Sequence, residues 1–219
     1  MKREITISED GSPTIYVEEL DEHYHSKFGA RTESEHIFIK AGLNFFQKKN
    51  TKQLNILEIG LGTGLNAYLS VQNIWGSTRV NYYAIEKYPL LKAEWMKLNF
   101  IHSEDNYPEV YQKIHSSDWE KPVQLIEGFH FFKSKVDLKN FTPPDGLHLV
   151  YFDAFSPDVQ PELWSCDVFR NIFNAMQKGA ILVTYSVKGV VKQNLKAVGF
   201  SLEKLPGPRG KRHMLRTIK

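Results

Sequence analysis

The sequence contains a single cysteine, Cys166, among 219 residues. It therefore cannot form a disulfide framework, and it is typical of a protein that folds in a reducing compartment. No stretch approaches the roughly 20 consecutive apolar residues of a membrane span, and the first residues, MKREITISEDG, lack the apolar run of a signal peptide. We therefore expect a soluble, cytoplasmic protein.

Potential metal ligands are also few. His23 and His25 lie close together in the sequence, but a metal site needs further ligands, and a single distant cysteine does not provide enough of them. We therefore expect no metal. What the chain does have is a core: 42% of its residues are hydrophobic, with 14 Phe, 10 Tyr and 4 Trp. This composition suits one folded α/β domain and argues against disorder.

The small net charge of +3 conceals a division along the chain. Residues 178–219 carry ten Lys or Arg and one acid, Glu203, a charge of +9, which leaves 18 basic and 24 acidic residues, or −6, before them. Such polarity favours a polyanionic partner, and nucleic acid is the first candidate. The alternative is a solvated surface that happens to be rich in lysine.

The stretch Leu54–Leu65, LNILEIGLGTGL, joins a short apolar run to three alternating glycines, Gly60, Gly62 and Gly64. The apolar run predicts a strand buried in a parallel sheet. The glycines predict a sharp strand-to-helix turn whose backbone a ligand can touch. The G-x-G-x-x-G dinucleotide fingerprint is excluded because Leu65 occupies the place of its third glycine, and no Walker lysine follows. The alternative is a turn that only packs a helix on the sheet.

The remaining pattern, E-x-G-x-G-x-G from Glu58 to Gly64, resembles the first motif of class I S-adenosylmethionine-dependent methyltransferases. An acid before the turn suits a ligand that carries an ammonium group and no phosphate. The resemblance implies a Rossmann-like fold with S-adenosylmethionine as cofactor. The cofactor ligands expected around the turn are Glu58, Gly60, Gly62, Gly64 and Asn66.

Two further acids follow predicted strands. Glu86 ends the strand 80–85, about 20 residues beyond the glycine turn, where a carboxylate accepts hydrogen bonds from a ribose diol. An ordinary helix-capping acid is the alternative for Glu86. Asp137 follows the strand 129–135, at a place where many methyltransferases of this class recognise the adenine amino group. Both carboxylates are therefore expected to bind the cofactor.

The whole chain alternates strands and helices, which predicts a doubly wound α/β fold with a mostly parallel, seven-stranded sheet and an antiparallel C-terminal hairpin. We expect residues 1–46 to form a hairpin and a substrate-side cap, and residues 47–219 to form the methyltransferase domain. A turn at 10–13 separates the hairpin strands 4–8 and 14–17. The other expected strands are 54–59, 80–85, 129–135, 147–152, 180–185, 200–205 and 213–218. The expected helices are 34–46, 65–74, 90–100, 162–176 (capped by Gly179) and 187–198, and 102–122 is expected to be an irregular or short helical insertion.

Four stretches, ELDEHYHSKFGA, EIGLGTGLN, DAFSPDVQPELW and LPGPRGKRHML, resemble the tRNA methyltransferase family that completes 5-methylaminomethyl-2-thiouridine at the wobble position. That family occurs alone or as the first half of a bifunctional protein. His213 departs from its pattern, which has glutamate there. The resemblance implies methyl transfer to the primary amine of 5-aminomethyl-(2-thio)uridine in the tRNA anticodon loop. The bifunctional relatives add a flavin-dependent half, for which this chain is too short, so we expect no flavin.

Asp153 follows the strand 147–152 and is therefore expected at the same sheet edge as the glycine turn. A carboxylate there can orient the attacking amine and take its proton, which makes Asp153 the predicted catalytic residue. An unstacked wobble base can lie against aromatic side chains, and basic side chains can contact phosphates. The expected substrate and tRNA contacts are Tyr24, Ser26, Phe155, Pro157, Trp164, Lys211 and Arg212.

Two other classes of function share part of this pattern. A small-molecule N-methyltransferase or an aminopropyl transferase would have the glycine turn and the acidic strand ends, although a small amine gains nothing from a basic tail. A non-catalytic RNA-binding protein could keep the fold, but it would not need Asp153 beside an intact Glu58–Gly64 turn.

Overall fold

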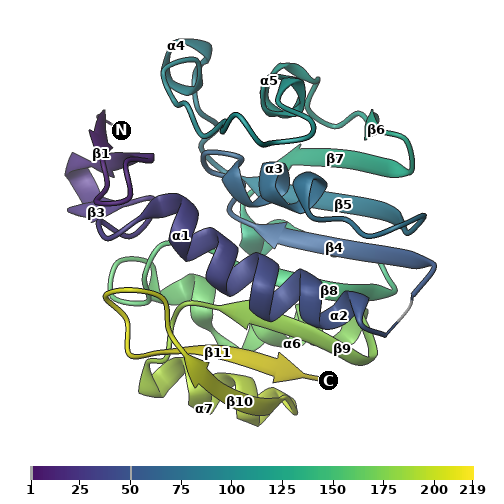
Figure 1. Cartoon of the computed structure of the whole chain (residues 1–219). Coiled ribbons are helices and arrows are strands. Elements are labelled where there is room, and N and C mark those ends of the chain that lie inside the picture. Colours follow the sequence, from purple (N-terminus) through teal and green to yellow (C-terminus); the bar gives the residue numbers. More distant parts are fainter. Residues whose placement is uncertain (1, 50) are drawn as a thin grey trace.

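The computed structural model describes residues 2–49 and 51–219, which form one large sheet covered by helices and a small sheet near the N-terminus (Figure 1). In the large sheet β9, β8, β4, β5 and β7 are parallel, whereas β6, β11 and β10 pair antiparallel with their neighbours. The spatial order is β10 (Ser201–Pro206), β11 (His213–Ile218), β9 (Met176–Thr184), β8 (Leu147–Phe152), β4 (Gln53–Ile59), β5 (Arg79–Glu86), β7 (Phe129–Lys135) and β6 (Val123–Ile126).

The central strands are apolar on both faces because helices cover both sides of the sheet. In β8, Leu149 and Tyr151 join the core cluster on one face, and Val150 and Phe152 join the cluster on the other. All four side chains are fully buried. A strand buried in this way has no polar face, which is why its sequence reads as a continuous apolar run.

The helices form two layers. One face of the sheet carries the continuous helical segment α1 (Ala30–Ser34), η2 (Glu35–Asn44, π-helical) and α2 (Phe45–Gln47), with α3 (Leu65–Gln72) and α5 (Glu109–Ser116); the other carries α6 (Cys166–Ala175) and α7 (Gly189–Val198) (Figure 1). Short helices are η1 (Glu18–Leu20), α4 (Lys92–Trp95), η3 (Leu138–Asn140) and η4 (Pro161–Trp164).

The predicted N-terminal hairpin is confirmed. It consists of β1 (Arg3–Ile7) and β2 (Pro13–Val17), and a short third strand, β3 (Glu22–His23), pairs with β2. Arg3 fastens this sheet to the segment after β5, since its Nη1 donates to Pro89 O at 3.2 Å and to Glu94 Oε2 at 3.1 Å. The small sheet is thereby held beside the large one.

The predicted Rossmann-like class is confirmed, but the sheet has eight strands rather than seven. The additional strand is β6, in a hairpin with β7 that turns at Gly128, where φ is +76°. The helix predicted at 90–100 is confined to α4, which is followed by a turn in which Lys97 N donates to Glu94 O and Leu98 N to Trp95 O, both at 3.1 Å.

Two other helix boundaries also differ from the prediction. The helix predicted from 162 is interrupted at Ser165, whose Oγ accepts from Val168 N at 3.4 Å and caps α6. Gly179 does not cap that helix, which ends at Ala175. Gly179 instead lies inside β9 with φ +77°, and its N–H donates to Lys219 O at 2.9 Å.

Among the described residues, no helix is both long and apolar enough to cross a membrane. In the same part of the chain, no three His, Cys, Asp or Glu side chains gather in a way that could hold a metal ion.

The winding of the sheet creates a crevice. After β4 the chain enters α3 on one face, and after β8 it reaches α6 on the other. Because β4 and β8 are neighbours, the loops that follow them diverge and leave a space at the carboxyl ends of these strands, where open α/β sheets bind ligands.

Candidate functional site

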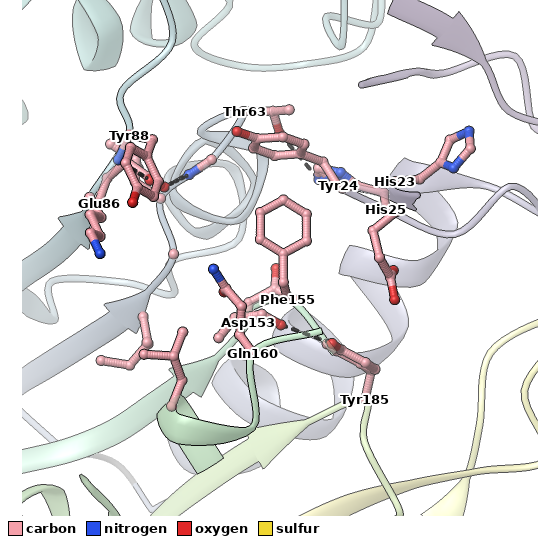
Figure 2. A pocket seen from close by; sticks show the side chains of 18 of the residues that line it. His23, Tyr24, His25, Thr63, Glu86, Tyr88, Asp153, Phe155, Gln160 and Tyr185 are labelled. Atoms are coloured by element: carbon pink, nitrogen blue, oxygen red, sulfur yellow. Dashed lines mark hydrogen bonds between the residues drawn. The ribbon is translucent and has the colours of Figure 1, made fainter. Parts of the chain in front are cut away.

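A cavity of about 410 Å³ occupies this crevice, within the size range of ligand pockets. Its lining comes from the ends of β4, β5, β7, β8 and β9 with the residues that follow them, from the N-terminal segment 21–27, from Glu33 in α1 and from Lys211 in the β10–β11 loop. Figure 2 shows Asp153 near its middle, between Glu86 and Tyr185.

The glycine turn forms the floor at the end of β4. Gly60 and Leu61 donate their N–H groups to Ile85 O at 3.1 and 3.0 Å, which ties the turn to β5. Gly60 has φ +87°, and a Cβ there would lie 2.7 Å from the carbonyl oxygen of Asp153. Only glycine fits so close to the neighbouring strand end. Gly62 lines the cavity itself.

Glu86 is fixed at the end of β5. Its Oε2 accepts from Gly62 N at 3.0 Å, and its Oε1 accepts from Tyr88 N at 2.8 Å. Each carboxylate oxygen has a second lone pair that remains for a ligand. The carboxylate therefore stands beside the glycine turn in a defined orientation.

Asp137 lies further along the same edge. Its Oδ2 pairs with Lys87 Nζ at 2.9 Å, its Oδ1 accepts from Lys139 N at 3.0 Å, and these contacts, the Lys87 hydrogen bond foremost, lower the pKa of Asp137. The wall beside it is apolar, and it suits a flat aromatic ring. This wall is formed by Ile85, Val136, Leu138 and Leu163.

Asp153 is the carboxylate at the centre of the cavity. Its Oδ2 accepts from Asn66 Nδ2 at 2.8 Å. Burial raises the pKa of Asp153 to about 7, and the nearby Glu33 carboxylate adds to the rise, whereas the Asn66 hydrogen bond and the Lys211 ammonium oppose it. An acid with this pKa exchanges a proton near neutral pH, which is the property of a general base.

Glu33 is a second carboxylate near Asp153, and it comes from α1. The residue is 8% exposed; its Oε2 accepts from Ser26 N at 2.8 Å, and its Oε1 pairs with Lys211 Nζ. The Lys211 ammonium also lies 4.2 Å from the centre of the Tyr185 ring. Tyr185 in turn donates to Ala154 O at 2.8 Å. These contacts join both ends of the chain in one wall of the cavity.

The N-terminal segment covers the glycine turn. A Cβ on Gly62 would lie 3.0 Å from Tyr24 Cδ1, so the Tyr24 ring rests on the turn. Tyr24 also meets Phe155 edge to face, with ring centres 5.1 Å apart, and Figure 2 shows the two rings on one side of Asp153. The predicted aromatic wall therefore includes these two residues.

Most of the predicted site residues come together in this cavity. Those that line it are Gly60, Gly62, Asn66, Glu86, Asp137, Asp153, Tyr24, Ser26, Phe155 and Lys211.

Five predicted residues do not line the cavity. Glu58 is fully buried beneath the turn with its Oε2 bonded to Tyr82, so it does not face the cofactor space. Gly64 faces α5, where a Cβ would lie 3.0 Å from His115 Nε2. Trp164 is 1% exposed and packs in the core. Pro157 is buried outside the lining, and Arg212 is exposed beyond it.

Among the lining residues that were not predicted as part of the site, three make contacts close to Asp153 or the glycine turn. Glu33 and Tyr185 build the wall around Asp153, and His25 donates to or accepts from Thr63 Oγ1 at 3.1 Å, next to the glycine turn. Burial lowers the pKa of His25 to about 4, so this ring is neutral. The only sequence signal was that His25 stands beside Tyr24 and Ser26; Glu33 and Tyr185 carried none.

The basic tail, residues 178–219, is partly neutralised by three acids from elsewhere in the chain and by its own Glu203. Four of its ten cations form ion pairs: Lys188 with Asp158, Arg209 with Glu9, Lys211 with Glu33 and Arg216 with Glu203. The cavity lies at the carboxyl ends of the parallel strands, whereas Lys178 is near the start of β9 and Lys219 follows Ile218, which pairs with Ile181. Lys178 and Lys219 are therefore at the opposite end of the sheet from the cavity. The tail therefore does not present its whole charge on one face.

Comparisons with known proteins agree with this geometry. A family model described as S-adenosyl-L-methionine-dependent methyltransferase matches residues 102–219, more than half of the chain. The tRNA 5-methylaminomethyl-2-thiouridine biosynthesis bifunctional protein MnmC of Leptospira interrogans is 31% identical over 216 residues, which are 90% of this chain and 32% of that protein. The protein of the same name from Cupriavidus metallidurans is 29% identical over 229 residues, which are 95% of this chain and 32% of that protein. This chain thus spans about a third of the length of these relatives.

Solved structures extend the likeness over nearly the whole chain. MnmC2 from Aquifex aeolicus superposes with a TM-score of 0.83 at 25% identity, covering 99% of this chain and 70% of that one. Spermidine synthase from Thermotoga maritima, at 10% identity and a TM-score of 0.62, covers 99% of this chain and 68% of its own, and it shares the fold alone. The chain therefore belongs to the S-adenosyl-L-methionine-dependent methyltransferase family, and over nearly its whole length it is similar to MnmC2 and to part of MnmC.

Proposed function

We propose that the protein transfers a methyl group from S-adenosylmethionine to the primary amine of 5-aminomethyl-(2-thio)uridine at the wobble position of tRNA. The observation that carries the proposal is the position of Asp153, in one cavity with the glycine turn and Glu86. The likeness to proteins named for 5-methylaminomethyl-2-thiouridine biosynthesis supports the same substrate.

The cavity residues fit the cofactor. Glu86 offers acceptors for the ribose diol, the apolar wall around Leu138 suits adenine, and Gly62 leaves the backbone open to the remainder of the molecule. We retain Asp137 as the partner of the adenine amino group. When bound, S-adenosylmethionine supplies a methyl group on a positively charged sulfur.

Asp153 handles the proton of the amine. A protonated amine has no lone pair for attack, so the site must hold the free base in line at about 3 to 3.5 Å from the methyl carbon. Asp153 would accept the proton that the amine nitrogen loses once it has taken the methyl group that the cofactor supplies. Because the pKa of Asp153 is raised to about 7, the carboxylate is a competent acceptor at neutral pH.

The N-terminal segment supports the proposed base-binding role. Tyr24 and Phe155 present aromatic rings to the cavity, suited to an unstacked base from a single-stranded loop. We assign residues 1–46 to a substrate-side cap and residues 47–219 to the methyltransferase domain. Two exposed cations, Lys27 on the cavity lining and Arg212 next to Lys211, are the proposed phosphate contacts.

The test is incubation with labelled S-adenosylmethionine and tRNA that lacks the final methyl group, followed by nucleoside analysis. Label is expected in 5-methylaminomethyl-(2-thio)uridine. Label in another nucleoside, or none, overturns the proposed substrate.

A free polyamine is the second candidate substrate, because acids gather on the substrate side of the cavity. They are Asp21, Glu22, Glu33, Asp153 and Glu162. Adding a polyamine in place of tRNA to the same assay distinguishes the two candidates: label transferred to the polyamine with unlabelled tRNA favours the small-molecule reading.

Glu86→Gln is expected to weaken binding of S-adenosylmethionine by roughly 10- to 100-fold, because hydrogen bonds to a charged acceptor contribute about 1.5–3 kcal/mol. Isothermal titration calorimetry measures the change. Glu127→Gln is the matched control, since Glu127 is an exposed acid in the β6–β7 turn, at the opposite sheet edge. Equal affinities of the two variants would remove Glu86 from the ribose site.

Lys211 and Arg212 are adjacent but are expected to respond differently to replacement by Met. Lys211→Met removes the cation that opposes protonation of Asp153, so the low-pH limb of kcat/KM should move above pH 7. Arg212→Met should leave that limb in place and reduce the slope of log K for tRNA against log salt by about 0.7 to 0.9, the loss of one phosphate contact. An unchanged salt slope in Arg212→Met would count against a phosphate contact of Arg212. An unshifted pH limb in Lys211→Met would show that Lys211 does not affect protonation of Asp153.

A further inference from the structure

An ion pair lies in the cavity wall beside Asp153. Lys211 Nζ donates to Glu33 Oε1, and both residues line the cavity. The Lys211 ammonium also lies 4.2 Å from the centre of the Tyr185 ring. Tyr185 in turn donates its hydroxyl to the carbonyl oxygen of Ala154, which follows Asp153. These contacts order three charged groups along the wall: the carboxylate of Asp153, the ammonium of Lys211 and the carboxylate of Glu33.

The ion pair is fixed in position but keeps hydrogen-bonding capacity. Glu33 Oε2 accepts from Ser26 N at 2.8 Å, so each carboxylate oxygen of Glu33 has one partner and a further lone pair. In the described part of the chain, Glu33 is the one hydrogen-bond partner of Lys211 Nζ, and an ammonium has three donors. The Lys211 side chain is 31% exposed and that of Glu33 is 10% exposed. The wall therefore offers a donor next to an acceptor to a molecule in the cavity.

Lys211 is the lysine of the lining that lies on the side of Asp153. Among the described residues, the other lysines of the lining are Lys27 and Lys87. Lys87 Nζ pairs with Asp137 at 2.9 Å on the cofactor side, and Lys27 is exposed. Burial and a nearby carboxylate raise the pKa of Asp153, and the Lys211 ammonium opposes this rise. A substrate amine at Asp153 is therefore within the electrostatic range of Lys211.

The proposed substrate presents complementary groups in the same order. On the uracil ring, the aminomethyl group, O4 and N3–H are carried by three successive ring atoms, C5, C4 and N3. The amine and N3–H are donors, and O4 is an acceptor. A base whose amine lies at Asp153 therefore places O4 and then N3–H along the adjoining wall. Unstacked bases are read by hydrogen bonds to this Watson–Crick edge.

We propose that the Lys211–Glu33 pair reads the edge of the wobble uracil: Lys211 Nζ donates to O4, and a carboxylate oxygen of Glu33 accepts from N3–H. The two side chains are then specificity-determining residues, and this role rests on the proposed function. Cytosine presents the reverse pattern, an amino donor at C4 and an acceptor at N3. Its amino group would face the ammonium and its N3 would face the carboxylate, so the pair rejects cytosine.

The test compares anticodon stem-loops that carry 5-aminomethyluridine, its N3-methyl derivative or 5-aminomethylcytidine, each with labelled S-adenosylmethionine. For the wild-type protein, kcat/KM is expected to be lower by about 100-fold or more for the cytidine, in which both contacts are reversed. It should be lower by about 10- to 100-fold for the N3-methyl derivative, which loses one hydrogen bond to a charged group. Equal kcat/KM for uridine and cytidine overturns the proposal.

Glu33→Ala is expected to lower kcat/KM for the uridine stem-loop by about 10- to 100-fold and to remove the effect of the N3-methyl group to within about threefold. A merely structural role of Glu33 would lower both rates and leave the N3-methyl effect in place, and that result overturns the proposal. Glu9→Ala is the matched control. It breaks another ion pair between the N-terminal segment and the C-terminal tail, Glu9 with Arg209 at 3.1 Å, outside the cavity lining, and it should keep the N3-methyl effect.

Lys211→Met is expected to narrow the preference for uridine over cytidine to about tenfold or less, because no ammonium remains to donate to O4 or to repel the cytosine amino group. Arg212→Met is the control next to it, and it should retain the full preference. An unchanged preference in Lys211→Met overturns the contact with O4.

The outcomes separate this proposal from the proposed function, because all three substrates carry the same amine. No label in any stem-loop overturns the proposed function and the base reading with it. Label that does not distinguish the bases leaves the methyl transfer standing and overturns the base reading alone. The comparisons with the wild type and Lys211→Met decide the matter even where Glu33→Ala fails to fold.

Discussion

Asp153→Asn is expected to lower kcat for methyl transfer by about 10²- to 10⁴-fold, the usual contribution of a positioned general base. Asparagine has nearly the same shape, so the change removes the proton acceptor while leaving the cavity intact. Wild-type kcat/KM should fall as the pH drops below about 7, where Asp153 takes up a proton. That limb should be missing in the variant, which retains only the titration of the substrate amine.

Single-turnover kinetics with labelled S-adenosylmethionine measure this effect apart from product release. The control is cofactor affinity, which should change little, since Glu86 and the glycine turn remain intact in Asp153→Asn. Full activity in the variant would remove Asp153 from the mechanism and leave its raised pKa as a consequence of burial alone.

Gly60→Ala is expected to destabilise the fold by about 2–5 kcal/mol, from left-handed backbone strain and from overpacking. The φ of Gly60 is +87°, and the new Cβ would lie 2.7 Å from the carbonyl oxygen of Asp153. Since that carbonyl belongs to the backbone, relief of the clash must move Asp153 itself. We therefore expect a loss of activity in the fraction of the variant that remains folded.

Gly76→Ala is the matched control for this prediction. Gly76 has φ +59°, but a Cβ there would meet nothing within 4 Å. The control therefore carries the backbone strain without the clash, and it should cost about 1–2 kcal/mol with no effect on kcat. Urea unfolding compares the two variants, and equal losses of stability would show that the contact with Asp153 has no energetic weight.

The parallel part of the fold could be predicted because its signal is local. Strands such as β8 are buried on both faces, so their apolar runs stand out in the sequence. The strand β6 could not be predicted, because its four residues become a strand only by pairing with β7. The early start of α1 was also hidden: Ala30 N is capped by Ser8 and Ser12, 22 and 18 residues away.

Some residues of the candidate site could likewise be predicted from the sequence, and others could not. Gly60, Glu86 and Asp153 follow buried strands, and the rule that ligands bind at strand ends was sufficient to bring them together. Glu33 was missed because a helical residue gives no sign that it will face a cavity. Trp164 was misplaced for a related reason, since an aromatic side chain suits a cavity wall and a core equally, and it packs against Phe152 in the core.

The pairing of Glu33 with Lys211 also bears on how the protein matures. These residues are 178 positions apart, and at about 5–20 residues per second the ribosome needs roughly 9 to 36 s to pass from one to the other. Late in that interval, once Asp153 has been made, the nascent chain contains the glycine turn, Glu86 and Asp153, but Glu33 still has no cation. The wall that Glu33 and Lys211 form beside Asp153 is therefore the last part of the cavity to be completed during synthesis.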